Sequence, residues 1–146
     1  MVLEGFAGLK FVMEGRDENR YEDAVWSETD HNLDFIFSRD GMAYGVEVKN
    51  TLAYIDQDEF NLKIRMCQML GVLPVFAARM LPRTWIWELN EAGGYAMVLE
   101  YQLYPWAHRD LAKRVAKELG LPVDTPKRLA QGTMTKFLNW HMLNIR

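Results

Sequence analysis

Residues 33–49 read LDFIFSRDGMAYGVEVK, and this stretch predicts a β-hairpin. Asp40-Gly41 is a favoured pair for a two-residue type I′ turn, because both central positions of that turn need a positive φ. With these two residues in the turn, Arg39 faces Met42, and the pairing continues residue by residue away from the turn. The turn chemistry therefore sets the register of both strands.

This register divides the hairpin into two faces, because side chains alternate along a strand. The core face holds three facing pairs, Leu33 with Val48, Phe35 with Val46 and Phe37 with Tyr44. The opposite face pairs Ile36 with Gly45 and Asp34 with Glu47, and Lys49 follows one pleat along. We expect this second face to be solvated. A slip of one residue would bury the carboxylates and expose the aromatic side chains, so burial and turn favour the same register.

Asp34 and Glu47 form an unusual pair for a sheet, because like charges that face each other across two strands destabilise the fold. A cation between them would remove the repulsion, and carboxylate oxygens suit hard ions such as Mg²⁺ or Mn²⁺. Lys49 would then orient a water or stabilise developing negative charge. The alternative is a solvated face with scattered charges, although such a face more naturally alternates in sign.

Asp34 followed by Glu47-Val48-Lys49 resembles the motif of the PD-(D/E)XK nuclease superfamily, the restriction-endonuclease-like fold of Holliday-junction resolvases and many repair nucleases. The resemblance covers about residues 30 to 80. It implies an α/β domain of three layers, with a central mixed β-sheet flanked by helices. It also implies metal-dependent hydrolysis of phosphodiester bonds, with Asp34, Glu47 and the Val48 carbonyl as metal ligands and Lys49 as the catalytic lysine.

Other positions fit the resemblance less directly. Leu33 stands where the motif's name has proline. Many members add a glutamate from a helix before the first strand, and here only Glu4 is in that position. Several members place a Lys or Gln of the next helix near the site, which points to Lys63 and Gln68. Either of these two can equally be a polar surface residue.

The sequence after the hairpin predicts a β-α-β crossover. Asp56 is a helix N-cap, Glu59 completes a capping box with it, and Gly71 ends the helix after about Leu70. Residues 73–78 form an uninterrupted apolar run that is too short for a helix and suits a strand buried on both faces.

Weaker patterns complete the chain. Residues 3–11 read as the end of a helix that runs into a first strand, and residues 14–30 read as a polar edge and loop in which Trp26 is either a core anchor or a DNA-stacking residue. Residues 82–94 predict a short helix, with a strand as the alternative, and residues 96–101 predict another strand.

Charge divides the chain. Residues 1–60 carry 5 Lys and Arg against 14 Asp and Glu, whereas the basic helical part, residues 107–146, carries 8 against 3. The first of its helices, from Ala107 to Leu119, is amphipathic, and the second begins at Thr125-Pro126. The apolar stripe of the first helix is Leu111, Val115 and Leu119, opposite Arg109, Lys113, Arg114 and Lys117. These basic helices either hold a duplex backbone or are simply solvated.

Length and composition predict a single domain over residues 1–146, with no membrane-spanning segment and no signal peptide. The chain can also be one domain of a longer protein. The lone Cys67 has no partner for an intrachain disulfide, which favours a cytoplasmic location, and its apolar helical neighbours place it in the core. His31, His108 and His141 lack the spacing of zinc ligands. No Gly-rich phosphate loop or nucleophile elbow is present.

The sequence thus predicts a Mg²⁺- or Mn²⁺-dependent deoxyribonuclease, an endonuclease of the restriction, repair or resolvase type. DNA is the expected partner, and a homodimer would bring two sites to the two strands of a duplex. The alternative is a catalytically inactive nuclease-like module that binds DNA or a protein. Metal binding through Asp34 and Glu47 discriminates between the two.

Overall fold

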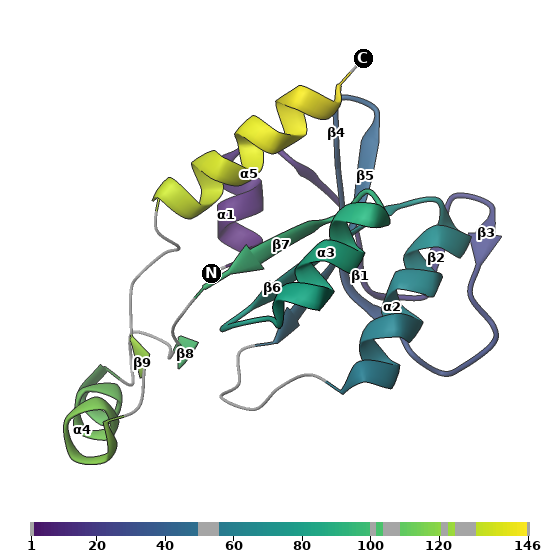
Figure 1. Ribbon diagram of the computed structural model, residues 1–146. Helices are drawn as coiled ribbons and strands as arrows, with labels where there is room; N and C mark the ends of the chain where they lie inside the picture. Colours follow the sequence, from purple (N-terminus) through teal and green to yellow (C-terminus); the bar gives the residue numbers. More distant parts are fainter. Residues whose placement is uncertain are drawn as a thin grey trace.

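The structure is a computed structural model, and it describes residues 2–49, 56–99, 102–103, 109–120, 123–124 and 131–145. At its centre is a mixed five-stranded sheet in the order β1-β4-β5-β6-β7 (Figure 1). The strands of this sheet are β1 (Val12–Glu18), β4 (Leu33–Arg39), β5 (Met42–Lys49), β6 (Leu73–Ala78) and β7 (Tyr95–Val98). β1, β4 and β5 are antiparallel, whereas β5, β6 and β7 are parallel.

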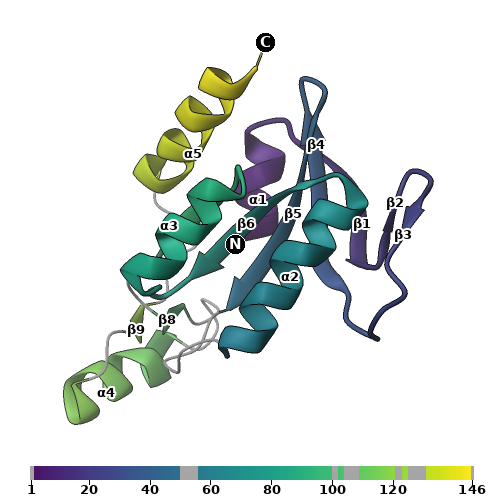
Figure 2. The same cartoon turned by 45° about the vertical axis from the view of Figure 1, so that its right-hand side comes forward.

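Helices cover both faces of the sheet. α1 (Val2–Gly8) and α5 (Gln131–Asn144) pack against one face, and α2 (Gln57–Leu70) and α3 (Arg83–Glu91) pack against the other (Figures 1 and 2). This arrangement confirms the predicted α/β class, with a mixed sheet between helical layers. No helix in the described part of the chain is long and apolar enough to cross a bilayer.

Two small strand pairs and one helix lie outside these layers or at their border. They are β2 (Arg20–Tyr21) with β3 (Ala24–Val25), β8 (Gln102–Leu103) with β9 (Val123–Asp124), and α4 (Arg109–Leu119). Figures 1 and 2 both place α4, β8 and β9 apart from the five-stranded sheet. The expected helix start at Thr125-Pro126 and the end of the strand expected over residues 96–101 lie outside the described residues.

The predicted hairpin register is confirmed near the turn. Asp40 and Gly41 have φ of 56° and 76°, as a type I′ turn requires. Arg39 faces Met42, and the ladder continues without a slip to the pair of Phe35 and Val46.

The prediction that Leu33 faces Val48 on the core face of Phe35 is wrong. The β4–β5 ladder ends at Phe35, and Leu33 packs with Ile36 and Cys67 in the core under α2. A Cβ on Gly45 would come within 2.8 Å of Leu33 Cδ1, which places Leu33 on the Gly45 side of the sheet. Beyond Phe35 the hydrogen bonds between β4 and β5 run through the side chains of Asp34 and Glu47, so the ladder no longer fixes the register there.

The expectation of a solvated second face is also wrong. Ile36 and Glu47 are fully or almost fully buried, because α2 lies over this face. The helix itself was predicted well: Gly71 adopts the left-handed conformation, with φ of 74°, and ends it after Leu70. The β5–α2–β6 crossover is parallel, as predicted.

Several local predictions are resolved by the packing. The stretch from residue 82 contains a helix and not a strand, because Trp85 and Leu89 lie one turn apart on the buried side of α3. Trp26 is 2% exposed and belongs to the core. Cys67 is buried as predicted, and burial raises the pKa of its thiol.

The capping box predicted for α2 does not form. Asp56 occupies the N-cap position, but its side chain makes no capping hydrogen bond. The carboxylate of Glu59 instead accepts a hydrogen bond from Lys49. Glu59 therefore pairs with Lys49 at the end of β5 and does not cap the N-terminus of α2.

Candidate functional site

The candidate site lies at one edge of the sheet. Because β4 and β5 are antiparallel, Asp34 at the start of β4 lies beside Glu47 and Lys49 at the end of β5. β5 and β6 are parallel, so β6 ends at the same edge, and the first turn of α2 follows nearby (Figure 2). In sheets of this kind, ligands bind outside the carboxyl ends of the parallel strands.

The two carboxylates are interlocked through the backbone. The amide of Asp34 donates to Glu47 Oε1 over 3.0 Å, and the amide of Val48 donates to Asp34 Oδ2 over 2.8 Å. Each carboxylate thus accepts a hydrogen bond from the neighbouring strand, at the point where the regular ladder has ended. These bonds fix both side chains and replace the ladder bonds that the pair of strands would otherwise make.

Lys63 of α2 brings a positive charge to Glu47. Its ammonium lies 3.0 Å from Glu47 Oε1 and also donates to the carbonyl of Asn32. The two side chains are almost fully buried, with 5% of Lys63 and 1% of Glu47 exposed. Lys63 therefore links Asn32, which precedes β4, to Glu47 of β5.

The surroundings of Glu47 disfavour its ionised form, even with Lys63 beside it. Burial, together with the nearby charge of Asp34, raises the pKa of Glu47 to about 7, although Lys63 acts in the opposite direction. The carboxylate gives up its solvation when it is buried, and one ammonium does not compensate for the loss. A further cation at this edge would stabilise the ionised form.

Lys49 is only half-buried and pairs with Glu59 in the first turn of α2, with 2.8 Å between Nζ and Oε1. Burial lowers the pKa of Lys49, but the hydrogen bond to Glu59 and the charges of Glu59, Glu47 and Asp34 outweigh it, so the pKa is raised overall. The same contact lowers the pKa of Glu59. Lys49 is thus a permanent cation at neutral pH.

The donor set suits a divalent ion held by few protein ligands. The hydrogen bonds and the ion pair use Asp34 Oδ2 and Glu47 Oε1, and the second oxygen of each carboxylate accepts none within the described ranges. No cluster of three or more His, Cys, Asp or Glu side chains of metal-binding geometry occurs there either. Mg²⁺ commonly takes one or two carboxylates and completes its shell with waters and substrate phosphates, so two carboxylates suffice.

The other predicted site residues separate into two groups. Lys63 joins the carboxylates, whereas Gln68 lies on the exposed side of α2 and lines a shallow groove with Glu88 and Glu91 of α3. Glu4 belongs to α1, which packs on the opposite face of the sheet. A role for Glu4 in the site, like the metal-ligand role of the Val48 carbonyl, stays a prediction.

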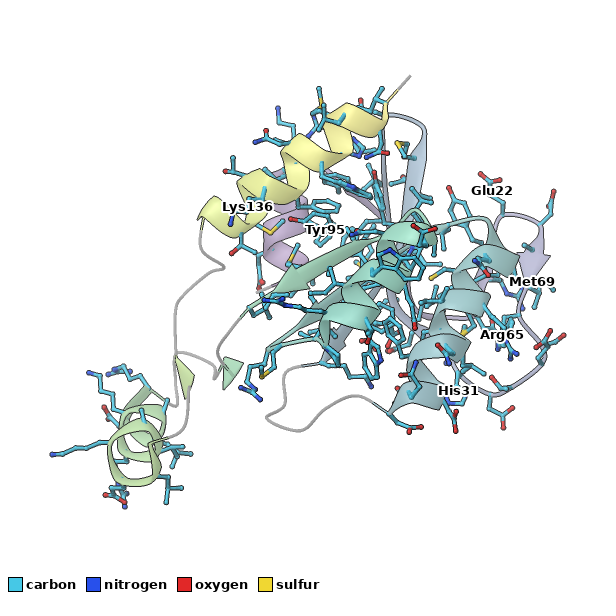
Figure 3. All side chains as sticks on the ribbon, viewed as in Figure 1. Glu22, His31, Arg65, Met69, Tyr95 and Lys136 are labelled. Atoms are coloured by element: carbon cyan, nitrogen blue, oxygen red, sulfur yellow. The ribbon has the colours of Figure 1, made fainter. Side chains whose placement is uncertain are left out.

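Histidines do not join the carboxylates in the described structure. His31 lies beside α2 (Figure 3), where its Nδ1 and the Thr29 hydroxyl are 2.9 Å apart. His141 is buried at the far end of the hairpin, and His108 lies outside the described residues. The sequence argument missed Glu59 as the partner of Lys49. It also left Lys63 undecided, although a lysine among the apolar positions of α2 indicates a buried anion.

No protein-family model, curated protein or solved structure matches this chain. The interpretation of the site consequently depends on the chain's own geometry.

Proposed function

We propose that the protein is a divalent-metal-dependent deoxyribonuclease of the PD-(D/E)XK type. The observation that carries the proposal is the interlocked pair of Asp34 and Glu47 at the sheet edge, with Lys49 at the end of the same strand as Glu47. The order of elements around the pair agrees with the proposal, since a hairpin is followed by a helix and then by a buried parallel strand.

Each residue has a distinct part in the proposed reaction. Asp34 and Glu47 would hold the divalent ion, and Lys63 keeps Glu47 oriented. The ion, when bound, polarises the scissile phosphate and makes a water easier to deprotonate. Lys49 stays charged, so it neutralises the phosphate or orients the water and does not act as a general base.

One observation favours the alternative, a nuclease-like module without activity. The ammonium of Lys63 already lies against Glu47 and supplies part of the positive charge that a metal would bring. A scaffold of this kind would keep the carboxylates for folding alone. It would bind DNA or a protein without needing Mg²⁺ or Mn²⁺.

Calorimetric titration with Mn²⁺ distinguishes the two functions. We expect the wild type to bind Mn²⁺ and Asp34→Ala to lose the binding, because half of the donor set is removed. If the wild type cleaves branched, nicked or linear DNA in Mg²⁺ and Asp34→Ala does not, the nuclease proposal holds. A wild type that neither binds Mn²⁺ nor cuts any of these substrates contradicts the proposal and leaves the inactive module.

The role of Lys49 has its own test. We expect Lys49→Ala to bind Mn²⁺ as the wild type does but to cleave DNA about 100-fold more slowly, because one preorganised charge is lost at the reacting phosphate. The matched control is Arg65→Ala, which removes another cation that is paired with a glutamate at the surface, Glu28. Full activity of Lys49→Ala would remove this residue from the mechanism.

A further inference from the structure

α4 presents a strongly basic and exposed surface. Lys113, Arg114 and Lys117 are all exposed, and with Arg109 they follow one side of the helix. Figure 3 shows nitrogen-tipped side chains that extend outward from α4. The ion pair of Arg114 with Glu118 is 3.7 Å long and solvent-exposed, so it leaves the guanidinium accessible to another anion.

This surface stands out against an acidic chain. Residues 1–60 carry 14 acidic and 5 basic residues, and the whole chain has a formal net charge of −3. A net negative charge repels a polyanion, so binding needs a local patch of positive potential. Within the described ranges, α4 concentrates four basic residues in 11 positions.

α5 does not offer a comparable surface. Its aromatic residues serve the core: Phe137 is fully buried and Trp140 packs on the same cluster. Lys136, labelled in Figure 3, is the one Lys or Arg in the described helix. The basic C-terminal part therefore divides into a structural helix and an exposed one.

The position of α4 relates it to the candidate site. Figures 1 and 2 both place α4 beyond the edge of the sheet at which β5 and β6 end, the edge that carries Asp34, Glu47 and Lys49. α4 contacts β9, and among the described residues Figures 1 and 2 place it apart from the five-stranded sheet. Its basic side is thus available to a ligand that also reaches this edge.

We propose that α4 is a DNA-backbone-binding arm, which holds the sugar-phosphate backbone of the duplex that the Asp34–Glu47 site cuts. The inference rests on the proposed function and assigns its main electrostatic contact. A helix of 11 residues is about 16 Å long and can contact several phosphates of one duplex, which carries one charge per ~1.7 Å of axis.

The apolar side of α4 does not indicate another protein as the occupant. Leu111 and Leu119 are 51% and 68% exposed, but a stripe of three side chains is far smaller than the surface that a stable dimer buries. A basic amphipathic helix can also bind anionic membranes, and the experiment below includes that outcome.

The test is fluorescence anisotropy with a labelled random-sequence duplex over a NaCl series, in Ca²⁺ to limit cleavage. We compare the wild type with Lys113→Gln/Arg114→Gln/Lys117→Gln and with the matched control Leu111→Gln/Leu119→Gln on the same helix. We expect the basic-face variant to bind at least 10-fold more weakly, and the slope of log K against log salt to fall by about 1 per lost phosphate contact. The control should bind as the wild type does.

Three results would overturn the proposal: unchanged DNA binding in the basic-face variant, an equal loss in the leucine variant, or wild-type binding to phosphatidylserine vesicles but not to DNA. Circular dichroism checks that both variants retain their helix. Mn²⁺ titration of the basic-face variant separates the two proposals, because its carboxylates are untouched. Normal Mn²⁺ binding with unchanged DNA affinity would exclude the arm and leave the metal site intact.

Discussion

Each end of the β4–β5 hairpin holds a buried ionisable side chain, and the two ends differ in how well the surrounding groups satisfy it. At the turn, Nδ1 of buried His141 lies 2.5 Å from the Tyr44 hydroxyl, and its Nε2 donates to Asp40 over 2.9 Å. Both ring nitrogens of His141 thereby have a polar partner. At the open end, Glu47 is buried with one ammonium and faces the charge of Asp34.

The ionisable groups of the two ends differ accordingly. The hydrogen bond from His141, helped by Arg39, lowers the pKa of Asp40, so the turn stabilises its charge. Burial raises the pKa of Glu47 to about 7, so the open end disfavours its charge. Ionisable groups whose surroundings disfavour the charged form are typical of sites that bind a ligand or perform chemistry. Under the proposed function, we therefore expect the turn end to serve folding and the open end to hold the metal.

The largest effect is expected from Lys63→Met. The substitution leaves Glu47 buried without its cation, and breaking a buried ion pair from one side costs about 3 to 5 kcal/mol. Chemical denaturation at pH 8 measures this loss. At pH 5 the loss should be smaller, because the variant can then protonate Glu47.

The double variant Lys63→Met/Glu47→Gln is the control for this prediction. It removes the charge together with its partner, so we expect it to regain most of the stability that Lys63→Met loses. A Lys63→Met protein as stable as the wild type at pH 8 would show that the ammonium is not needed at the open end, and the contrast between the two ends would disappear.

A second prediction concerns pH and the metal-free wild type. The folded protein holds the proton of Glu47 up to about pH 7, whereas the unfolded chain releases it near 4.5. The free energy of unfolding should therefore fall as the pH rises from about 4.5 to 7, by roughly 3 kcal/mol in total, and then level off. Denaturation in EDTA across this range measures the fall.

Glu47→Gln provides the comparison, because it cannot titrate. Its stability should lack the decline between pH 4.5 and 7, so that the difference between variant and wild type shifts in favour of the variant as the pH rises. Parallel curves for the two proteins would mean that Glu47 is not under electrostatic strain.

Sequence rules predicted the turn end better than the open end, for a physical reason. Asp40-Gly41 and the alternation near it are local, so the register follows from them. Leu33 departs from alternation because the ladder stops at Phe35, which no local rule specifies. The ion pair of Lys63 depends on which side of α2 meets the sheet, and the buried His141 depends on α5, far along the chain. The residues of the site were named from their types and spacing, but their partners come from tertiary packing.

The smallest effect is expected at the turn end, from His141→Phe. Phenylalanine retains the aromatic packing against Phe11 but cannot form a hydrogen bond with Tyr44, whose hydroxyl is then left with a weak contact to the Met42 sulfur at 3.8 Å. An unsatisfied buried hydroxyl costs about 2 kcal/mol.

Asp40→Asn is the milder control, since asparagine tolerates the positive φ and keeps an acceptor for the ring. Because this cluster lies at the opposite end of the hairpin, Mn²⁺ binding by His141→Phe should be unchanged. If the variant lost Mn²⁺ binding while remaining folded, the two ends would be coupled, and the division between a folding end and a functional end would not hold.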